Sequence, residues 1–288
     1  MLQDLEFGRL ENEFRERKPG REDIIVCFHE DQVLIKRDEK DTLRLPSYQE
    51  VWGWAEENHW KSWNETEIQY VFRMQDTNYF IWWGEAGESS DSAYAYESIR
   101  TLRQLISKDI CYGVMTAWHL FAWYRNNRFC GRCGAMTVHD KKERMMRCPS
   151  CGNMIFPRIA PSVIVAVTHG DKLLLSKYAN RAYTRYALLA GFTEIGETAE
   201  ETVAREVMEE VGLKVKNIRY YKTQPWGVDG NLLLGFYCDL DGEDHITLDR
   251  EELAMAEWYD RDHLPAHDDG ISLTREMIRI FEEGKEPR

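Results

Sequence analysis

Apolar residues in the first part of the chain follow both strand and helix periods. Ile24–Lys36 has two apolar runs on either side of a short polar stretch, which predicts two short strands. Ile68–Trp83 predicts a hairpin that turns at Asp76-Thr77-Asn78. Between Ser98 and Asn126 apolar residues recur three and four positions apart, which predicts helix. These elements indicate a mixed α/β domain.

The second part of the chain alternates strand and helix patterns. Ser162–Tyr178 predicts a strand pair that turns at His169-Gly170-Asp171. The short apolar run Tyr186–Gly191 predicts a buried strand, and Asn231–Leu240 predicts another. Thr274–Gly284 is typical of a terminal helix. An α/β fold follows for this part as well.

A helix is predicted for Thr198–Val211, which has good helix formers and neither Gly nor Pro. Thr198 is a suitable N-cap, and Gly212 is a suitable C-terminal stop. Val203, Val207 and Val211 recur every fourth residue and are expected to face a core.

Three glutamates on this helix pose an electrostatic problem. Glu206, Glu209 and Glu210 stand at i, i+3 and i+4, so they share one face. Like-charge pairs at this spacing each cost about 0.2–0.5 kcal/mol on an exposed helix, and Arg205 alone cannot neutralise three carboxylates. A hard divalent cation such as Mg²⁺ or Mn²⁺ takes oxygen ligands and would offset the repulsion. A solvated acidic face is the alternative interpretation.

Four of the seven cysteines have metal-ligand spacing. Cys130, Cys133, Cys148 and Cys151 form C-x2-C-x14-C-x2-C, which predicts a structural zinc site with no open coordination position. A redox CxxC pair or a coincidence are the alternatives. The other three cysteines are expected to be small buried hydrophobic residues in a reducing compartment.

Charge and composition narrow the class of protein. The chain has 288 residues, 43% of them hydrophobic, so it can bury a core. Its net charge of −13 argues against broad, non-specific nucleic-acid binding. Between Arg125 and Arg158, however, eight Lys and Arg face only two acidic residues, which suggests an anionic ligand or an ordinary solvated surface. No apolar run reaches the about 18 residues of a membrane helix and no secretory signal is recognisable, so we expect a cytoplasmic protein.

The glutamate-rich segment resembles the complete Nudix signature, Gx5Ex7REUxEExGU with U aliphatic, from Gly191 to Leu213. The resemblance implies an α/β/α sandwich with a mixed sheet, and metal-dependent hydrolysis of a nucleoside diphosphate linked to another group. It also assigns roles by position: metal ligands at Glu206, Glu209 and Glu210, an orienting Arg205, and a supporting Glu197. The general base is left open between Glu209 and Glu210.

A cysteine module directly before such a domain resembles the bacterial NADH pyrophosphatase family, whose members are also NAD-cap hydrolases on RNA. The similarity extends from about Asn127 to Ile278. It implies cleavage of NAD(H) into nicotinamide mononucleotide and AMP by a homodimer. We therefore expect three domains: an N-terminal α/β domain at 1–126, a zinc ribbon at 127–157 and a Nudix domain at 158–288.

Further site residues are implied by the same resemblance. Phe192 and Phe156 should sandwich the nicotinamide, although the family usually has Tyr at the second position. Glu143 matches an acidic ribbon residue that approaches substrate. Ala190 corresponds to a backbone carbonyl that binds metal, and Glu252 matches a further metal-binding glutamate, with Glu251 as its rival.

One segment departs from the family pattern. The substrate-binding run Gln224-Pro225-Trp226 is normally followed by PFPxS, but here by Gly227-Val228-Asp229-Gly230-Asn231. Two prolines are lost and two glycines gained, which frees the backbone. ADP-ribose or a dinucleoside polyphosphate is therefore an alternative substrate. A non-catalytic sensor of nucleotides or nucleic acid is a further alternative.

Overall fold

The computed structural model describes residues 1–6, 8–38, 42–57, 67–84, 93–180, 185–265 and 270–287. The chain folds into two compact units. The N-terminal unit contains Asp4–Arg158 and Gly227–Asp229, and the C-terminal unit contains Met1–Gln3, Ile159–Trp226 and Gly230–Arg288. The division into three domains stays a prediction.

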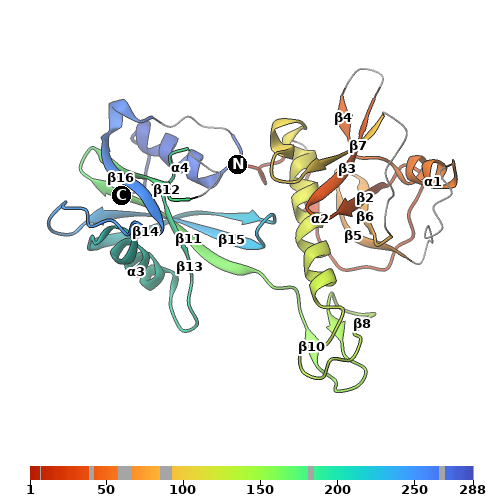
Figure 1. The fold of residues 1–288 in the computed structure, drawn as a ribbon. Coiled ribbons are helices and arrows are strands. Elements are labelled where there is room, and N and C mark those ends of the chain that lie inside the picture. The colour runs from red at the N-terminus through yellow and green to blue at the C-terminus, as the bar shows by residue number, and fades with distance from the viewer. Residues whose placement is uncertain are drawn as a thin grey trace. The chain divides into compact units, whose positions relative to one another are not determined.

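The N-terminal unit is built on a mixed sheet in which β2 and β6 are parallel and the other pairs are antiparallel (Figure 1). The order is β1 (Leu10–Glu11), β5 (Ile68–Met74), β6 (Thr77–Trp82), β2 (Ile24–His29), β3 (Gln32–Arg37) and β4 (Leu43–Arg44), with β7 (Tyr94–Ser98) paired to β3. The predicted strand pair and hairpin are confirmed, but the predicted turn at Asp76-Thr77-Asn78 was wrong in position, because Thr77 and Asn78 already pair within the hairpin as part of β6. The hairpin turns at Gln75 and Asp76, whose positive φ angles of 49° and 65° match the twist of the two strands.

Two helices accompany this sheet, α1 (Tyr48–Glu57) and α2 (Lys108–Asn126). The prediction of helix from Ser98 was wrong for its first part, since α2 begins ten residues later. Its N-cap is Ser107, whose hydroxyl accepts a hydrogen bond from the Ile110 N–H. The preceding residues end β7 and form a single 3₁₀ turn at Leu102–Gln104 that buries Leu102. The apolar spacing around Leu102 thus reflects a short 3₁₀ turn that buries this side chain, and not the first turns of a long helix.

The short ribbon module belongs to the same unit and contains three antiparallel strands of two residues each, β8 (Val138–His139), β9 (Met146–Arg147) and β10 (Met154–Ile155).

The C-terminal unit is an α/β/α sandwich, as predicted (Figure 1). Its sheet runs in the order β14 (Val215–Trp226), β15 (Asn231–Leu240), β11 (Ala160–His169), β12 (Lys172–Tyr178) and β16 (Leu253–Asp260), with β13 (Leu189–Phe192) paired to β11. The sheet is mixed because β11 and β15 are parallel.

Alternate residues of β11 face the two helices of this sandwich. Val163, Val165 and Val167 pack in one core with the three valines of α3 (Ala199–Val211). Ile164 and Ala166 pack in the other core with α4 (Leu273–Glu282). A strand buried on both faces explains why its sequence is an almost continuous apolar run. In neither unit is a helix of the described residues long and apolar enough to cross a membrane.

Candidate catalytic and zinc sites

Helix α3 begins and ends where the sequence predicts. Thr198 is the N-cap, and it forms a capping box with Glu201 in which each side chain accepts a hydrogen bond from the other residue's backbone N–H. Gly212 ends the helix in the left-handed conformation with φ of 70°. These two caps fix where the helix begins and ends. They therefore determine which of its side chains face the end of β13 at Phe192.

Arg205 organises the carboxylates at this site. Its Nε and Nη2 donate to the two oxygens of Glu197 at 2.6 and 2.9 Å, a bidentate pair. Its Nη1 donates to Glu206 Oε1 at 2.8 Å and to Glu209 Oε2 at 2.9 Å, and Nη2 also donates to the Phe192 carbonyl. One guanidinium therefore connects the loop after β13 with two glutamates of α3.

Glu206 lies directly over Gly191. A Cβ added to Gly191 would stand 1.8 Å from Glu206 Cδ, so only glycine leaves room for this carboxylate. Glu206 is 8% exposed. Burial raises its pKa, Arg205 opposes this, and the charges of Glu209 and Glu252 raise the pKa further. A bound cation would stabilise the ionised form of Glu206 against burial and against the neighbouring negative charges.

The other predicted carboxylates differ in exposure. Glu210 is nearly fully buried at 2% exposure, whereas Glu209 is exposed and Glu252 follows the loop into β16. Of the two rival residues, Glu252 is the one whose charge acts on Glu206, and the Glu251 N–H instead donates to Asp249. Of the four predicted glutamate ligands, Glu206 and Glu209 are joined through Arg205, but the four do not form a tight ligand group within the described residues. The divalent-cation site therefore stays a prediction from carboxylate chemistry.

Glu197 is held as a carboxylate by its neighbours. The hydrogen bond from Arg205, followed by that from the Glu194 N–H, lowers its pKa to about 2. Thr202, which the sequence reasoning did not single out, also donates to Glu197 through its hydroxyl at 3.0 Å. Thr202 is fully buried, and its only sequence signal is a polar residue beside Val203 on the inner side of the helix.

The predicted substrate residues fall into both units. Phe192 ends β13 with 55% of its surface exposed, and Ala190 lies two residues earlier in the same strand. Phe156 and Glu143 belong to the ribbon, where Phe156 is 52% exposed and Glu143 is also exposed. Large exposed aromatic rings are available for stacking on a ligand ring.

The Gln224-Pro225-Trp226 segment forms the end of β14. Gln224 is fully buried, with Nε2 donating to the Ile271 carbonyl and Oε1 accepting from the Leu273 N–H. Its side chain therefore fixes the start of α4. Pro225 is exposed and Trp226 is half-buried at the strand end.

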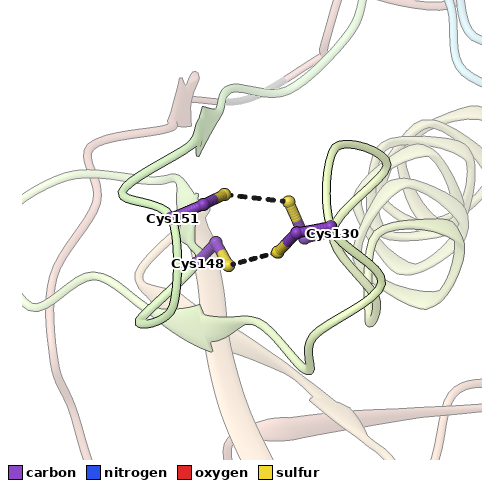
Figure 2. A group of neighbouring side chains, drawn as sticks. Cys130, Cys148 and Cys151 are labelled. Carbon is purple, nitrogen blue, oxygen red and sulfur yellow. Dashed lines mark hydrogen bonds between the residues drawn. The ribbon is translucent and has the colours of Figure 1, made fainter.

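The four predicted cysteines come together in the ribbon (Figure 2). Their sulfur atoms lie within 4.8 Å of one another, with Cys130 3.6 Å from Cys151 and Cys133 3.5 Å from Cys148. Sulfurs of a tetrahedral zinc site with Zn–S bonds near 2.3 Å stand about 3.8 Å apart. The arrangement fits a structural zinc ion, and no other tight group of cysteine, histidine or acidic ligands occurs in the described part of the chain.

Two matching turns build this quartet. The Gly134 N–H donates to the Cys130 carbonyl, and the Gly152 N–H donates in the same way to Cys148. Both glycines have φ above 70°, which only glycine adopts without strain.

The thiols also differ in acidity. The N–H of Arg132 helps to lower the pKa of Cys130 to about 6. At Cys151 the Asn153 N–H favours the thiolate, but burial and the neighbouring sulfurs raise the pKa to about 11. Four adjacent thiolates repel one another, and a dication removes that conflict.

Two family descriptions match this chain. Residues 158–280 match the NUDIX domain, and residues 125–156 match the NADH pyrophosphatase zinc ribbon domain. The two matches follow one another directly, and together they contain both the cysteine quartet and the glutamate helix.

Several curated proteins are similar to this chain over more than half of its length. NAD-capped RNA hydrolase NudC of Shigella dysenteriae is 41% identical over 167 residues, which are 57% of this chain and 65% of that relative. The protein of the same name from Erwinia tasmaniensis is 38% identical over 184 residues, 63% of this chain and 70% of the relative. The chain spans 61% to 65% of the length of the first relatives that it matches.

Solved structures with similar folds include a NUDIX hydrolase from Nitrosomonas europaea. It has a TM-score of 0.47 at 24% identity and covers 54% of this chain and 91% of its own.

Proposed function

This chain belongs to the Nudix family whose members carry an NADH pyrophosphatase zinc ribbon, and on that premise we propose that it hydrolyses the diphosphate of NAD(H) to nicotinamide mononucleotide and AMP. The observation that carries the proposal is the carboxylate arrangement at Gly191. Arg205 holds Glu206 and Glu209 with a single nitrogen while it fixes Glu197 with the other two. An exposed Phe192 adjoins this arrangement.

The proposed metal ligands are Glu206, Glu209, Glu210 and Glu252 with the carbonyl of Ala190, and the proposed ion is Mg²⁺ or Mn²⁺. When bound, such an ion neutralises the diphosphate and lowers the pKa of a coordinated water. The chain itself orients Glu206 and Glu209 of this set through Arg205. A general base needs access to the attacking water, and Glu209 has solvent access that the buried Glu210 lacks. We therefore assign the base to Glu209.

The proposed substrate contacts are aromatic and polar. Phe192 and Phe156 stack on the nicotinamide, Glu143 approaches it, and Pro225 and Trp226 line the substrate path. Gln224 acts as a positioning residue, because its polar atoms are used within the fold.

NAD-capped RNA contains the same diphosphate, and the relatives are named for that substrate. We propose it as a second substrate of the same site. We further propose a homodimer and a cytoplasmic location, the latter supported by the three buried thiols outside the zinc quartet, Cys27, Cys111 and Cys238, which suit a reducing compartment.

The test is to incubate the zinc-loaded protein with NADH and Mn²⁺ and to resolve the products. We expect reduced nicotinamide mononucleotide and AMP, and a loss of turnover of about 10²-fold or more in Glu210→Gln. Glu200→Gln, an exposed change on the same helix, is the matched control and should keep wild-type turnover.

ADP-ribose and a dinucleoside polyphosphate are tested in parallel. Faster cleavage of either than of NADH would replace the proposed substrate. Failure to cleave any of the three by a folded, zinc-loaded protein would contradict the proposed reaction.

A further inference from the structure

A cavity of about 480 Å³ lies within the N-terminal unit, and no cysteine of the quartet lines it. It is lined by residues 14–18, by Gln69 and Tyr70 of β5, by Trp83 and by the ribbon residues His139 and Asp140. Its volume is in the range of about 300–1,000 Å³ that is usual for small-ligand sites. No role proposed above uses these side chains.

Basic side chains form one wall of this cavity. Arg15, Arg17 and Lys18 are exposed and line it together with Glu16, while Asp140 lines it from the ribbon, so cations outnumber carboxylates by three to two. Arg15 pairs with Glu13, but within the described part of the chain neither Arg17 nor Lys18 pairs with a carboxylate. Arg17 lies over the Tyr70 ring, 5.4 Å from its centroid. Charge in this wall is thus available to an anion.

A half-buried arginine of the ribbon contacts β5 beside the cavity, although it does not line the cavity. Arg144 Nη2 donates to the Val71 carbonyl at 2.6 Å, while Nη1 is buried and has no partner among the described residues. Burial lowers its pKa, and no described carboxylate pairs with it. Burial raises the pKa of the Tyr70 hydroxyl, whereas the charges of Arg17, Arg15 and Arg144 lower it and the charge of Glu11 raises it. A cation that is desolvated without a counter-charge is costly unless an anion completes it.

An aromatic ring and a polar edge face the same space. Trp83 is half-buried and stacks with one face on Phe121, at 5.2 Å and 17°. Its Nε1 donates to Gln69 Oε1 at 3.2 Å, and Gln69 Nε2 lies 3.3 Å from His139 Nδ1. The indole is therefore held in a fixed orientation beside an amide and an imidazole. Fixed aromatic rings next to cations are the usual platform for an unpaired nucleobase and its phosphates.

We propose that this cavity binds single-stranded RNA, with a base against Trp83 and the phosphates on Arg15, Arg17 and Lys18. The inference rests on the proposed function in one respect, since the strand would be the RNA body attached to an NAD cap. The net charge of −13 confines such binding to this locally basic wall.

The test is fluorescence anisotropy of the zinc-loaded full chain with a labelled, uncapped single-stranded RNA of about ten nucleotides. Arg17→Glu combined with Lys18→Glu changes two exposed residues and should leave the fold intact. We expect the affinity to fall about tenfold or more and the slope of log K against log salt to become shallower by about 2. The matched control is Arg21→Glu, an exposed charge reversal in the same segment that does not line the cavity. It should stay within about twofold of wild type.

A second variant tests stacking separately from charge. Trp83→Leu keeps an apolar side chain against Phe121 but removes the ring, and we expect about fivefold weaker binding or more with an unchanged salt slope. Thermal unfolding of each variant checks that the fold is kept.

Unchanged affinity and salt slope in the double variant, or no RNA binding by the wild type, would overturn the proposal. Turnover of free NADH is measured on the same samples and should be equal in all of them. RNA binding that depends on this cavity in a protein without NADH cleavage would remove the proposed function and leave this site. NADH cleavage combined with RNA binding that the variants do not change would keep the proposed function and remove this site.

Discussion

The cysteine quartet and the glutamates of α3 are both candidate cation sites, yet the chain supports them in different ways. The quartet is held by three strands of two residues each and by two glycine turns. The glutamates stand on a thirteen-residue helix with a capping box, a valine stripe in the core and Arg205 between the carboxylates. We therefore expect the short strands of the first site to depend on its ion for their shape, whereas Arg205 orients two ligands of the second, Glu206 and Glu209, without an ion.

Removal of zinc should give the largest effect and tests the first half of this contrast. Structural zinc sites contribute about 10–16 kcal/mol in isolated ribbon-sized peptides, so chelation or Cys148→Ser should unfold the ribbon. Hydrogen exchange should show lost protection between residues 128 and 156 and retained protection in β11 and α3. Ser150→Ala, an exposed change between two of the ligands, is the control. Full protection of the ribbon after complete chelation would break the comparison.

Gly191→Ala tests the arrangement of the second site. The new Cβ would overlap the Glu206 carboxylate, so that group has to move. Displacement of a catalytic group by about 1 Å costs roughly 10²-fold in rate, and we expect a loss of this size in kcat with the fold retained. Gly53→Ala is the matched control, because its Cβ meets nothing within 4 Å. Wild-type kcat in Gly191→Ala would show that the position of Glu206 is not critical.

Thr198→Ala should have a smaller effect, and on stability rather than on chemistry. It removes the N-cap acceptor and one half of the capping box, which costs about 1 kcal/mol of unfolding free energy. Urea unfolding of the C-terminal unit measures this change. Glu201→Gln keeps an acceptor at the other half of the box and should lose less. A loss of kcat with unchanged stability would mean that the cap positions the glutamates directly.

Acid should produce the smallest effect, through Glu197. Its pKa is lowered from 4.5 to about 2 in the folded protein, so the folded state binds this proton less readily than the unfolded state. The resulting stability is present above about pH 4.5 and is lost as the pH falls towards 2. In the absence of divalent cation, Glu197→Gln should flatten that part of the pH profile of the unfolding free energy. An identical acid slope in the variant would show that Arg205 does not stabilise the fold through this pair.

Features within one helix or one pair of turns could be predicted from the sequence, because local geometry fixes where each side chain lies. The caps Thr198 and Gly212 followed from their residue types, the valine stripe from helix periodicity and the cysteine quartet from its spacing. Contacts between distant segments were not readable. The sequence around Gln224 does not indicate that this residue fixes the start of α4. No local pattern predicts that Arg144 lies against Val71 either.

The prediction of where α2 begins was wrong for a related reason. Leu102 and Ile106 have helical spacing, but β7 pairs with β3 and a 3₁₀ turn buries Leu102. Strand pairing with a segment 60 residues away in the chain outweighed a weak local preference.

The chain's first residues have a consequence for the order of folding during synthesis. Leu2 is fully buried in the C-terminal unit and donates its N–H to the carbonyl of Ile271. A ribosome that adds about 5–20 residues each second makes Leu2 wait tens of seconds for that partner. During this interval the whole N-terminal unit is made and can fold. Leu2, which belongs to the C-terminal unit, cannot yet bond to Ile271. The C-terminal unit is thus closed by residues that are made long before the rest of that unit.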